Sequence, residues 1–309
     1  MASYSSEVTG LDLSCEGLTE FPPELAKCEK LQYLYLGGNK ITTIPPWIGQ
    51  LTKLRVLSLA CNNITTVPPE IGQLTNLREL HLNNNKITTI PPEIGLCAQL
   101  RQLGLCNNAL AAIPKEIGDL TRLKYLSVNE NKLVHIPDEL KNLSRLRELF
   151  LLNNSLETYP EIIGHLTSLR ILWLGACNLV NFPQEILQLR HLRELRLNGN
   201  YLRRIPPEIN QLKKLKTLMV VQPHSTAMVV EDENYQTTGV LLWLEPEMLL
   251  VPGNSVEHLE ELDLGNKVML IIPQEMVTLK DILRNNGRSL SFRPDYQGVR
   301  IKMYCSGAI

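Results

Sequence analysis

The chain has 309 residues and a formal net charge of −1, because 31 lysines and arginines are balanced by 32 aspartates and glutamates. This balance excludes a strong general attraction to nucleic acid or to an anionic membrane surface. Residues 1–7 have neither a basic region nor an apolar run, and no apolar stretch reaches the roughly 18 residues of a membrane span. We therefore expect neither a secretory signal nor a membrane helix.

Seven cysteines are scattered along the chain, an odd number without a Cys-x-x-Cys pair. Disulfides persist in oxidising compartments, whereas scattered single thiols are typical of the reducing cytosol. The cysteine pattern therefore predicts a cytoplasmic protein with reduced thiols.

One interval, 23 residues, organises the first two thirds of the chain. Asparagine recurs at this interval, at Asn39, Asn62, Asn85, Asn108, Asn131, Asn154 and Asn200. Only Cys177 interrupts this series. Proline follows the same interval without interruption, at Pro22, Pro45, Pro68, Pro91, Pro114, Pro137, Pro160, Pro183 and Pro206. Two series with one spacing indicate a single structural unit repeated in tandem.

Each unit reads Leu-x-x-Leu-x-Leu-x-x-Asn-x-Leu and then, in the most regular copies, Ile-Pro-Pro-Glu-Ile-Gly. This pattern is that of the leucine-rich repeat. Its Leu-x-Leu pair alternates as a strand does, and one repeat cannot bury its apolar face without its neighbours. We therefore expect an α/β fold, a leucine-rich-repeat solenoid (horseshoe) with a parallel concave sheet and short helical turns on the convex side.

The asparagine column has a backbone reason. Where the chain bends away from each strand its peptide groups turn inward, and a buried amide can bond to them along the stack. Cys177 fits the space but makes weaker hydrogen bonds. The prolines end the extended segment, and the acid that follows most of them favours the start of a helical turn.

In chain order, residues 1–25 form an imperfect first turn with an acid at the asparagine position, which suits an N-terminal cap. Regular 23-residue repeats follow over residues 26–221. Residues 222–258 contain six acids without lysine or arginine, which predicts an acidic irregular insertion, and its apolar part 240–251 is expected to pack as an irregular repeat. Residues 259–309 are expected to hold one last repeat and a C-terminal cap over the sheet edge.

Catalytic and nucleotide-binding motifs are absent from the sequence. It contains no Gly-x-Ser-x-Gly, no P-loop, no His-Glu-x-x-His and no Gly-x-Gly-x-x-Gly. The six histidines are dispersed over different repeats and never approach metal-ligand spacing. We therefore expect a non-enzymatic protein with no cofactor and no metal.

The x positions of the repeat predict the surface of the concave sheet, because their side chains alternate with the core leucines. The first x is basic in consecutive repeats, at Arg55, Arg78, Arg101, Lys124, Arg147, Arg170, Arg193 and Lys216. The second x is partly acidic, at Glu79, Glu148 and Glu194. Either these acids and bases compensate one another on a solvated rim, or the bases face an acidic partner or the chain's own acidic insertion.

The third x carries large apolar side chains in two adjacent repeats, Phe150 and Trp173, with Leu152, Ile171 and Tyr125 nearby. Strand alternation directs them away from the leucine core, and exposed apolar clusters mark interaction sites in which Trp, Tyr and Arg are the usual anchors. Local packing, or contact with the acidic insertion, is the alternative. Tyr33 and Tyr35 form a smaller second patch. The predicted partner-binding residues are Tyr33, Tyr35, Tyr125, Arg147, Glu148, Phe150, Leu152, Arg170, Ile171, Trp173, Arg193 and Arg196.

The 23-residue form, with Pro-Pro-Glu-Ile-Gly-Gln-Leu-Thr-Asn-Leu-Arg-Glu-Leu at residues 68–80, resembles the Ras-group leucine-rich-repeat proteins. These include the Ras-suppressor and Shoc scaffold type and their plant intracellular relatives. The resemblance covers about residues 10–220. It implies an intracellular adaptor, since several such relatives act with small GTPases or phosphatases.

The sequence thus predicts a cytoplasmic protein-interaction scaffold in signal transduction, which binds a protein partner on its concave face. A small GTPase or another signalling complex is the partner that the resemblance implies, with no nucleic acid and no membrane span. The alternative is a substrate receptor or regulatory subunit of an enzyme complex, such as a ubiquitin ligase or a phosphatase, that docks through residues 284–309.

Overall fold

The computed structural model describes residues 4–157, 159–202 and 205–220, and beyond them only short backbone strands within residues 240–301. Most of the expected acidic insertion and of the expected C-terminal cap therefore lies outside the described residues, as does the docking segment of the alternative function. The chain divides into two compact units, residues 1–177 and 178–309. Each unit is described by itself.

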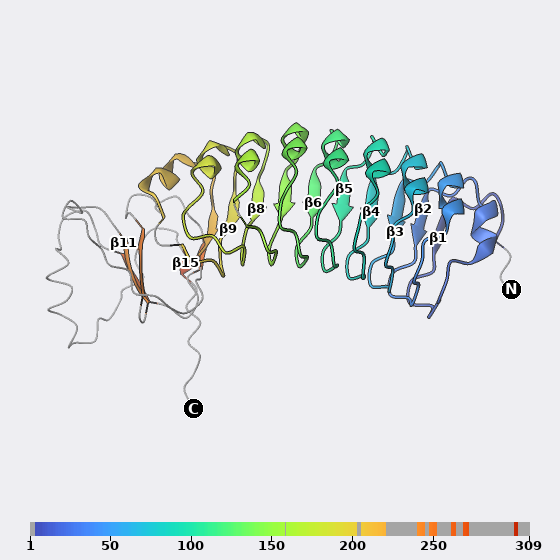
Figure 1. Cartoon of the computed structure of the whole chain (residues 1–309), viewed down its shortest axis with the longest axis horizontal. Coiled ribbons are helices and arrows are strands. Elements are labelled where there is room, and N and C mark those ends of the chain that lie inside the picture. The colour runs from blue at the N-terminus through green and yellow to red at the C-terminus, as the bar shows by residue number, and fades with distance from the viewer. Residues whose placement is uncertain are drawn as a thin grey trace, which may run out of the picture. The chain divides into compact units, whose positions relative to one another are not determined.

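Short parallel strands form the sheet of the first unit (Figure 1). Each pairs with the next in chain order, and the repeat places leucine level with leucine, as in Leu80 and Leu103. The strands are β1 (Gly10–Asp12), β2 (Tyr33–Tyr35), β3 (Val56–Ser58), β4 (Glu79–His81), β5 (Gln102–Gly104), β6 (Tyr125–Ser127), β7 (Glu148–Phe150) and β8 (Ile171–Trp173). The predicted parallel sheet is confirmed.

The leucines of the repeat fill the interior behind this sheet. Leu77, Leu80 and Leu82, which belong to one repeat, are each 0% exposed. Burying one such side chain contributes about 2 kcal/mol. Because each repeat packs mainly on its neighbours, this contribution accumulates along the stack rather than within one repeat.

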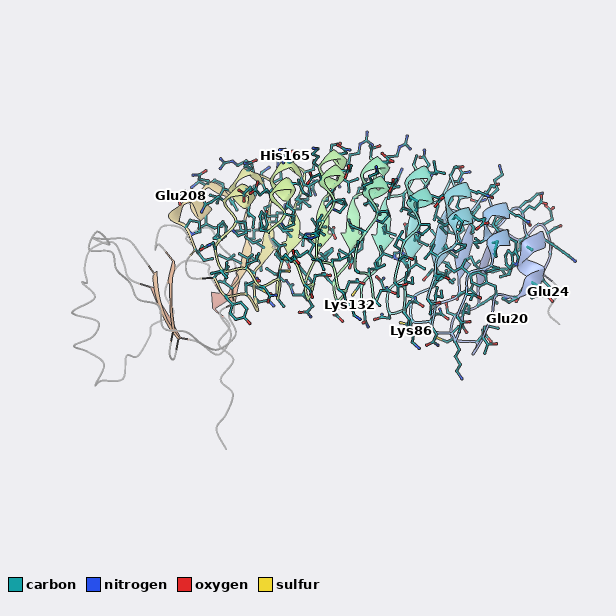
Figure 2. The ribbon with its side chains drawn as sticks, in the orientation of Figure 1. Glu20, Glu24, Lys86, Lys132, His165 and Glu208 are labelled. Carbon is teal, nitrogen blue, oxygen red and sulfur yellow. The ribbon has the colours of Figure 1, made fainter. Side chains whose placement is uncertain are left out.

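A 3-10 helix of five residues follows the proline of each repeat, as the sequence predicts. Pro68, for example, is extended (φ −73°, ψ 151°) and immediately precedes its helix. The helices of the first unit are η1 (Pro23–Lys27), η2 (Pro46–Gln50), η3 (Pro69–Gln73), η4 (Pro92–Leu96), η5 (Lys115–Asp119), η6 (Asp138–Asn142) and η7 (Glu161–His165). Figure 2 shows His165 on the helical side, while Lys86 and Lys132, each directly after an asparagine of the series, lie at the opposite edge.

The asparagine column forms the expected ladder of hydrogen bonds. The Asn131 Oδ1 accepts a hydrogen bond from the Leu110 N–H at 3.0 Å. Its Nδ2 donates to the carbonyl oxygens of Leu105 at 2.9 Å, of Val128 at 3.0 Å and of Asn129 at 3.0 Å. One amide thus joins its own repeat to the repeat before it, which fixes the spacing of the stack.

Cys177 reproduces part of this ladder. Its side chain is 1% exposed, and its single S–H is shared between the carbonyl oxygens of Leu151 and Gly175, each 3.3 Å from Sγ. A thiol is a weak donor, and it has no amide oxygen. The regular pattern would direct that oxygen to the Leu156 N–H, as Asn154 does to the Leu133 N–H at 3.1 Å.

The second unit continues the repeat and then departs from it. Its helices are η8 (Gln184–Gln188) and η9 (Pro207–Gln211). Four parallel strands pair in the order β9 (Glu194–Arg196), β10 (Thr217–Met219), β13 (Glu261–Asp263) and β15 (Arg300–Ile301). A separate antiparallel sheet contains β12 (Glu247–Val251), β11 (Val240–Leu244) and β14 (Val268–Ile271), with β11 in the middle. The expectation that residues 240–251 pack as an irregular repeat is therefore wrong, because their strands pair with each other instead of stacking in parallel.

None of the helices in the described stretches has the length and apolarity that crossing a bilayer requires.

Candidate protein-interaction face

The sheet of the first unit has one side packed on the leucine core and one side open, which we call the sheet face. The second and third x positions of the repeat lie on the sheet face in columns. Register places Ser127 of β6, Phe150 of β7 and Trp173 of β8 side by side. Tyr125, Glu148 and Ile171 form the neighbouring column in the same way.

Three aromatic rings meet on the sheet face and form what we call the aromatic cluster: Tyr125, Phe150 and Trp173. The Phe150 ring centroid lies 5.2 Å from that of Tyr125 and 4.7 Å from that of Trp173, with the second pair at 86°. Edge-to-face pairs at this separation contribute about 0.5–1.5 kcal/mol beyond burial alone. The structure thus brings together the three aromatic residues that the sequence singles out on adjacent strands.

Phe150 differs from the expectation of an exposed ring, since only 8% of it is exposed. It points away from the leucine core, as strand alternation predicts, but its two aromatic neighbours cover it. Tyr125 and Trp173 remain half-buried. The accessible part of the aromatic cluster is therefore made by these two residues, with Phe150 as its interior member.

The phenol of Tyr125 is neutral at pH 7, and its surroundings favour this neutral form further. Burial raises its pKa, and a hydrogen bond with the Ser127 side chain opposes this by a smaller amount. Ser127 is 3% exposed and lies beside Phe150 in the register, so a small polar side chain is buried next to the aromatic cluster. A neutral Tyr125 presents an apolar ring with one hydroxyl, a combination that is frequent at protein interfaces.

Leu152 and Ile171 flank the aromatic cluster and are each half-buried, as is Glu148. The Leu152 N–H donates to the Asn129 Oδ1 at 2.7 Å, so the chain beyond β7 is tied to the preceding repeat. These flanking residues were all predicted from the sequence. They border the rings without covering Trp173 completely.

Tyr33 and Tyr35 lie on β2 and are 38% and 37% exposed. Strands β3, β4 and β5 separate β2 from β6 in the sheet. The structure therefore does not join these two tyrosines to the aromatic cluster, and they remain a second patch, as the sequence predicts.

The first x positions form a basic rim along the first unit: Arg55, Arg78, Arg101, Lys124, Arg147 and Arg170. Consecutive members are linked through the backbone, as where the Arg170 N–H donates to the Arg147 carbonyl at 2.7 Å. Within residues 4–157 and 159–177, no basic-rim side chain forms an ion pair; Glu79 instead approaches His81 at 3.6 Å. The described part of this unit therefore shows no direct ion pair between the basic rim and its neighbouring acids.

Arg193 and Arg196 belong to the second unit and are described there. The side chain of Arg193 is exposed. Arg196 binds Glu194 of its own strand, Nε to Oε1 at 2.7 Å. Exposed or partly exposed pairs of this kind contribute about 0–1 kcal/mol.

The sequence analysis did not single out Arg145 and Ser168. Together with Lys124 and Arg147 they line an open hollow of about 330 Å³ at the basic rim. The sequence does contain a signal for this hollow, at the position before the first leucine of each repeat. Three consecutive repeats have the long side chains Gln99, Arg122 and Arg145 there, and the next repeat has the short Ser168. A shortened side chain in a column of long ones leaves a gap beside its neighbours.

The described cysteines are all free thiols: Cys15, Cys28, Cys61, Cys97, Cys106 and Cys177. Burial raises the pKa of Cys97 and of Cys177 to about 12, and burial together with Glu130 raises the pKa of Cys106. These three thiols are therefore poor nucleophiles. Among the described residues there is also no group of His, Cys, Asp and Glu that could hold a metal ion.

A stack of parallel strands backed by 3-10 turns defines a repeat solenoid of the leucine-rich class. Four family models match it: "Leucine rich repeat" over residues 6–59, "Leucine Rich repeats (2 copies)" over 52–93, "Leucine-rich repeat region" over 92–196 and "Leucine Rich Repeat" over 191–212. The chain belongs to the leucine-rich-repeat proteins. These models describe the repeat in general and do not distinguish the Ras-group type.

Solved structures resemble the chain over most of its length. A leucine-rich-repeat protein of Leptospira interrogans is 33% identical with a TM-score of 0.60, and the match covers 80% of this chain and 64% of that one. The ectodomain of the receptor kinase GASSHO1/SCHENGEN3 from Arabidopsis thaliana is 34% identical with a TM-score of 0.61, covering 68% and 26%. An internalin of Listeria monocytogenes, 24% identical with a TM-score of 0.65, covers 84% and 76% and shows the fold alone.

The chain thus spans less than two thirds of the Leptospira protein and about a quarter of the plant ectodomain. No curated protein sequence matches it significantly.

Proposed function

We propose that this protein is a non-enzymatic interaction scaffold that binds a protein partner on the sheet face of its first unit. The observation that carries the proposal is the aromatic cluster, in which buried Phe150 supports the half-buried Tyr125 and Trp173. Leucine-rich-repeat proteins typically act as interaction modules, and large aromatic side chains on such a face are the usual centres of binding energy.

The packing of the rings favours binding for a second reason. Trp173 is held edge-on by Phe150 at 4.7 Å, so its ring is already ordered before a partner arrives. Ordering a side chain on association costs about 0.5–1.5 kcal/mol, and a pre-ordered anchor avoids most of that cost. Leu152 and Ile171 would exclude water around the contact.

The basic rim supplies the charge for the proposed contact. Arg147 and Arg170 are exposed beside the aromatic cluster and would steer and orient an acidic edge of the partner. Arg193 and Arg196, which the sequence also predicts as contact residues, lie in the second unit, where Arg196 binds Glu194.

A protein ligand is consistent with one of the similar structures, since the GASSHO1/SCHENGEN3 ectodomain was solved in complex with CASPARIAN STRIP INTEGRITY FACTOR 2. The resemblance of residues 10–220 to the Ras-group repeats makes a small GTPase or its signalling complex, in the cytoplasm, the first partner to test. Docking of an enzyme complex through residues 284–309 has no supporting observation among the described residues.

Affinity capture from cell lysate, followed by measurement of the affinity for the purified partner, tests the proposal. Trp173→Ala should weaken binding by about 2 kcal/mol, roughly thirtyfold, without unfolding the chain. Trp47→Ala is the matched control, because Trp47 on η2 is also half-buried and edge-on to a phenylalanine, Phe21 at 5.8 Å. Equal affinity for both variants and the unaltered protein would remove the aromatic cluster from the binding surface.

A further inference from the structure

A second feature of the first unit points to a ligand of different chemistry. We call the open hollow of about 330 Å³ lined by Lys124, Arg145, Arg147 and Ser168 the basic hollow. Its volume is at the lower end of the range for small-ligand sites. None of its lining residues is apolar or aromatic, so it is unlike the aromatic cluster and does not depend on it.

The basic hollow exists because of a break in one column of side chains. The position before the first leucine holds Gln99, Arg122 and Arg145 in consecutive repeats, and then Ser168. The Arg122 guanidinium donates a hydrogen bond to the Gln99 side chain, so these two long side chains contact each other across adjacent repeats. The short Ser168 hydroxyl instead donates to the Ser144 carbonyl at 2.7 Å, which leaves the space beside Arg145 and Arg147 open.

The backbone holds three cations around this space. Arg145, in the turn before β7, and Arg147 flank the fully buried Leu146, and both side chains are exposed and line the basic hollow. The Arg147 N–H donates to the carbonyl of Lys124 at 2.9 Å, which sets Lys124, directly before β6, next to Arg147. Within residues 4–157 and 159–177 none of the three cations forms an ion pair with an acid, so all three can turn toward a ligand.

Three cations exceed what one carboxylate requires. A phosphoryl group on serine or threonine carries a charge of about −1.5 to −2 and three acceptor oxygens, which matches two guanidiniums and one ammonium. No aromatic or aliphatic residue lines the basic hollow, which favours a polypeptide over a nucleotide or a lipid as its ligand. A polypeptide could instead continue along the basic rim past Arg101 and Arg170, which lie on either side.

We propose that the basic hollow binds a phosphorylated serine or threonine side chain of a partner polypeptide. Arg145 and Arg147 hold the phosphoryl oxygens through charge-assisted, bidentate hydrogen bonds, and Lys124 completes the neutralisation. Clusters of arginine are the general means by which proteins recognise phosphorylated peptides.

The test uses three degenerate, fluorescently labelled peptide pools that differ only at their central residue: phosphoserine, serine or glutamate. The intact chain should bind the phosphoserine pool at least tenfold more tightly than either other pool, measured by fluorescence anisotropy at near-physiological salt. Arg145→Gln and Arg147→Gln should each remove about tenfold of this affinity, since both side chains are exposed and their loss leaves the fold unchanged.

Arg78→Gln is the matched control. It removes the same charge from the same basic rim but lies outside the basic hollow, so binding should fall less than twofold. Equal losses for Arg78→Gln and Arg147→Gln would show general electrostatic attraction and overturn the proposal, as would equal binding of the glutamate and phosphoserine pools. Trp173→Ala should leave this binding unchanged, so failure here is distinguishable from failure of the proposed function.

Discussion

The Phe150 ring meets the indole of Trp173 edge-on, with centroids 4.7 Å apart and an angle of 86° between the planes. The Tyr125 ring lies on the other side of Phe150, at 5.2 Å. A small hydrophobic core is thus built on the sheet face, separate from the leucine core behind the sheet. Within it Phe150 serves stability, whereas Tyr125 and Trp173 offer surface for contact.

Phe150→Ala should lower the free energy of unfolding by about 3 kcal/mol, because it removes a nearly fully buried ring and leaves a cavity between two others. Urea denaturation followed by circular dichroism measures the change. Tyr35→Ala is the control, since Tyr35 occupies the same column but is 37% exposed, and its loss should cost less than about 1 kcal/mol. If the two variants lose equal stability, the rings do not pack as described.

Asn131→Ala should also destabilise the chain, by about 3 kcal/mol. The substitution removes four hydrogen bonds and leaves the Leu110 N–H and three carbonyl oxygens to be satisfied otherwise in the interior. Asn76→Ala is the matched control, because the Asn76 amide makes an exposed bond to the Thr52 carbonyl at 2.9 Å and should cost less than about 0.5 kcal/mol. The same urea experiment serves, and a loss below 1 kcal/mol for Asn131→Ala would contradict the ladder.

Cys177→Asn should stabilise the chain by about 1 kcal/mol, since it restores an amide oxygen facing the Leu156 N–H and replaces one weak thiol donor with an amide NH₂ group. The regular repeats show that the surrounding backbone accepts asparagine at this position. A higher urea midpoint with an unchanged slope is the expected result. A lower midpoint would mean that packing around residue 177 has adapted to sulfur.

The native thiols should fall into two classes toward an aromatic disulfide reagent at pH 8. Cys15 and Cys61 are exposed and should react in the folded state. Burial raises the pKa of Cys97 and of Cys177 to about 12, so roughly one such thiol in ten thousand is ionised at pH 8. These two should react only after urea is added.

A Cys305→Ser background keeps the count to the described cysteines, and mass spectrometry of the labelled peptides assigns each site. Rapid labelling of Cys97 or Cys177 without urea would show that the interior of the repeats opens under native conditions.

Much of the architecture was readable from the sequence because the repeat is a local code. The 23-residue interval places Leu80 and Leu82 in the core, Asn85 in the ladder and Pro91 before a 3-10 helix, and each placement depends only on neighbours one repeat away. The sheet-face columns were predictable for the same reason, since parallel strands in register bring equal positions side by side.

Contacts between side chains of different repeats were not readable in this way. The sequence placed Phe150 on the sheet face, but its burial depends on the rotamers of Tyr125 and Trp173. Glu79 could have paired with a base of the basic rim, yet it lies near His81 of its own strand.

By itself, then, the sequence determined the repeat, its leucine core, its asparagine ladder and which residues the sheet face presents, because period and alternation fix backbone position. The tertiary structure decided which of those residues remain accessible, that β11 pairs antiparallel with β12 and β14, and that Ser168 leaves a hollow beside Arg145 and Arg147. These outcomes depend on side-chain length and packing across repeats, which a periodic pattern does not encode.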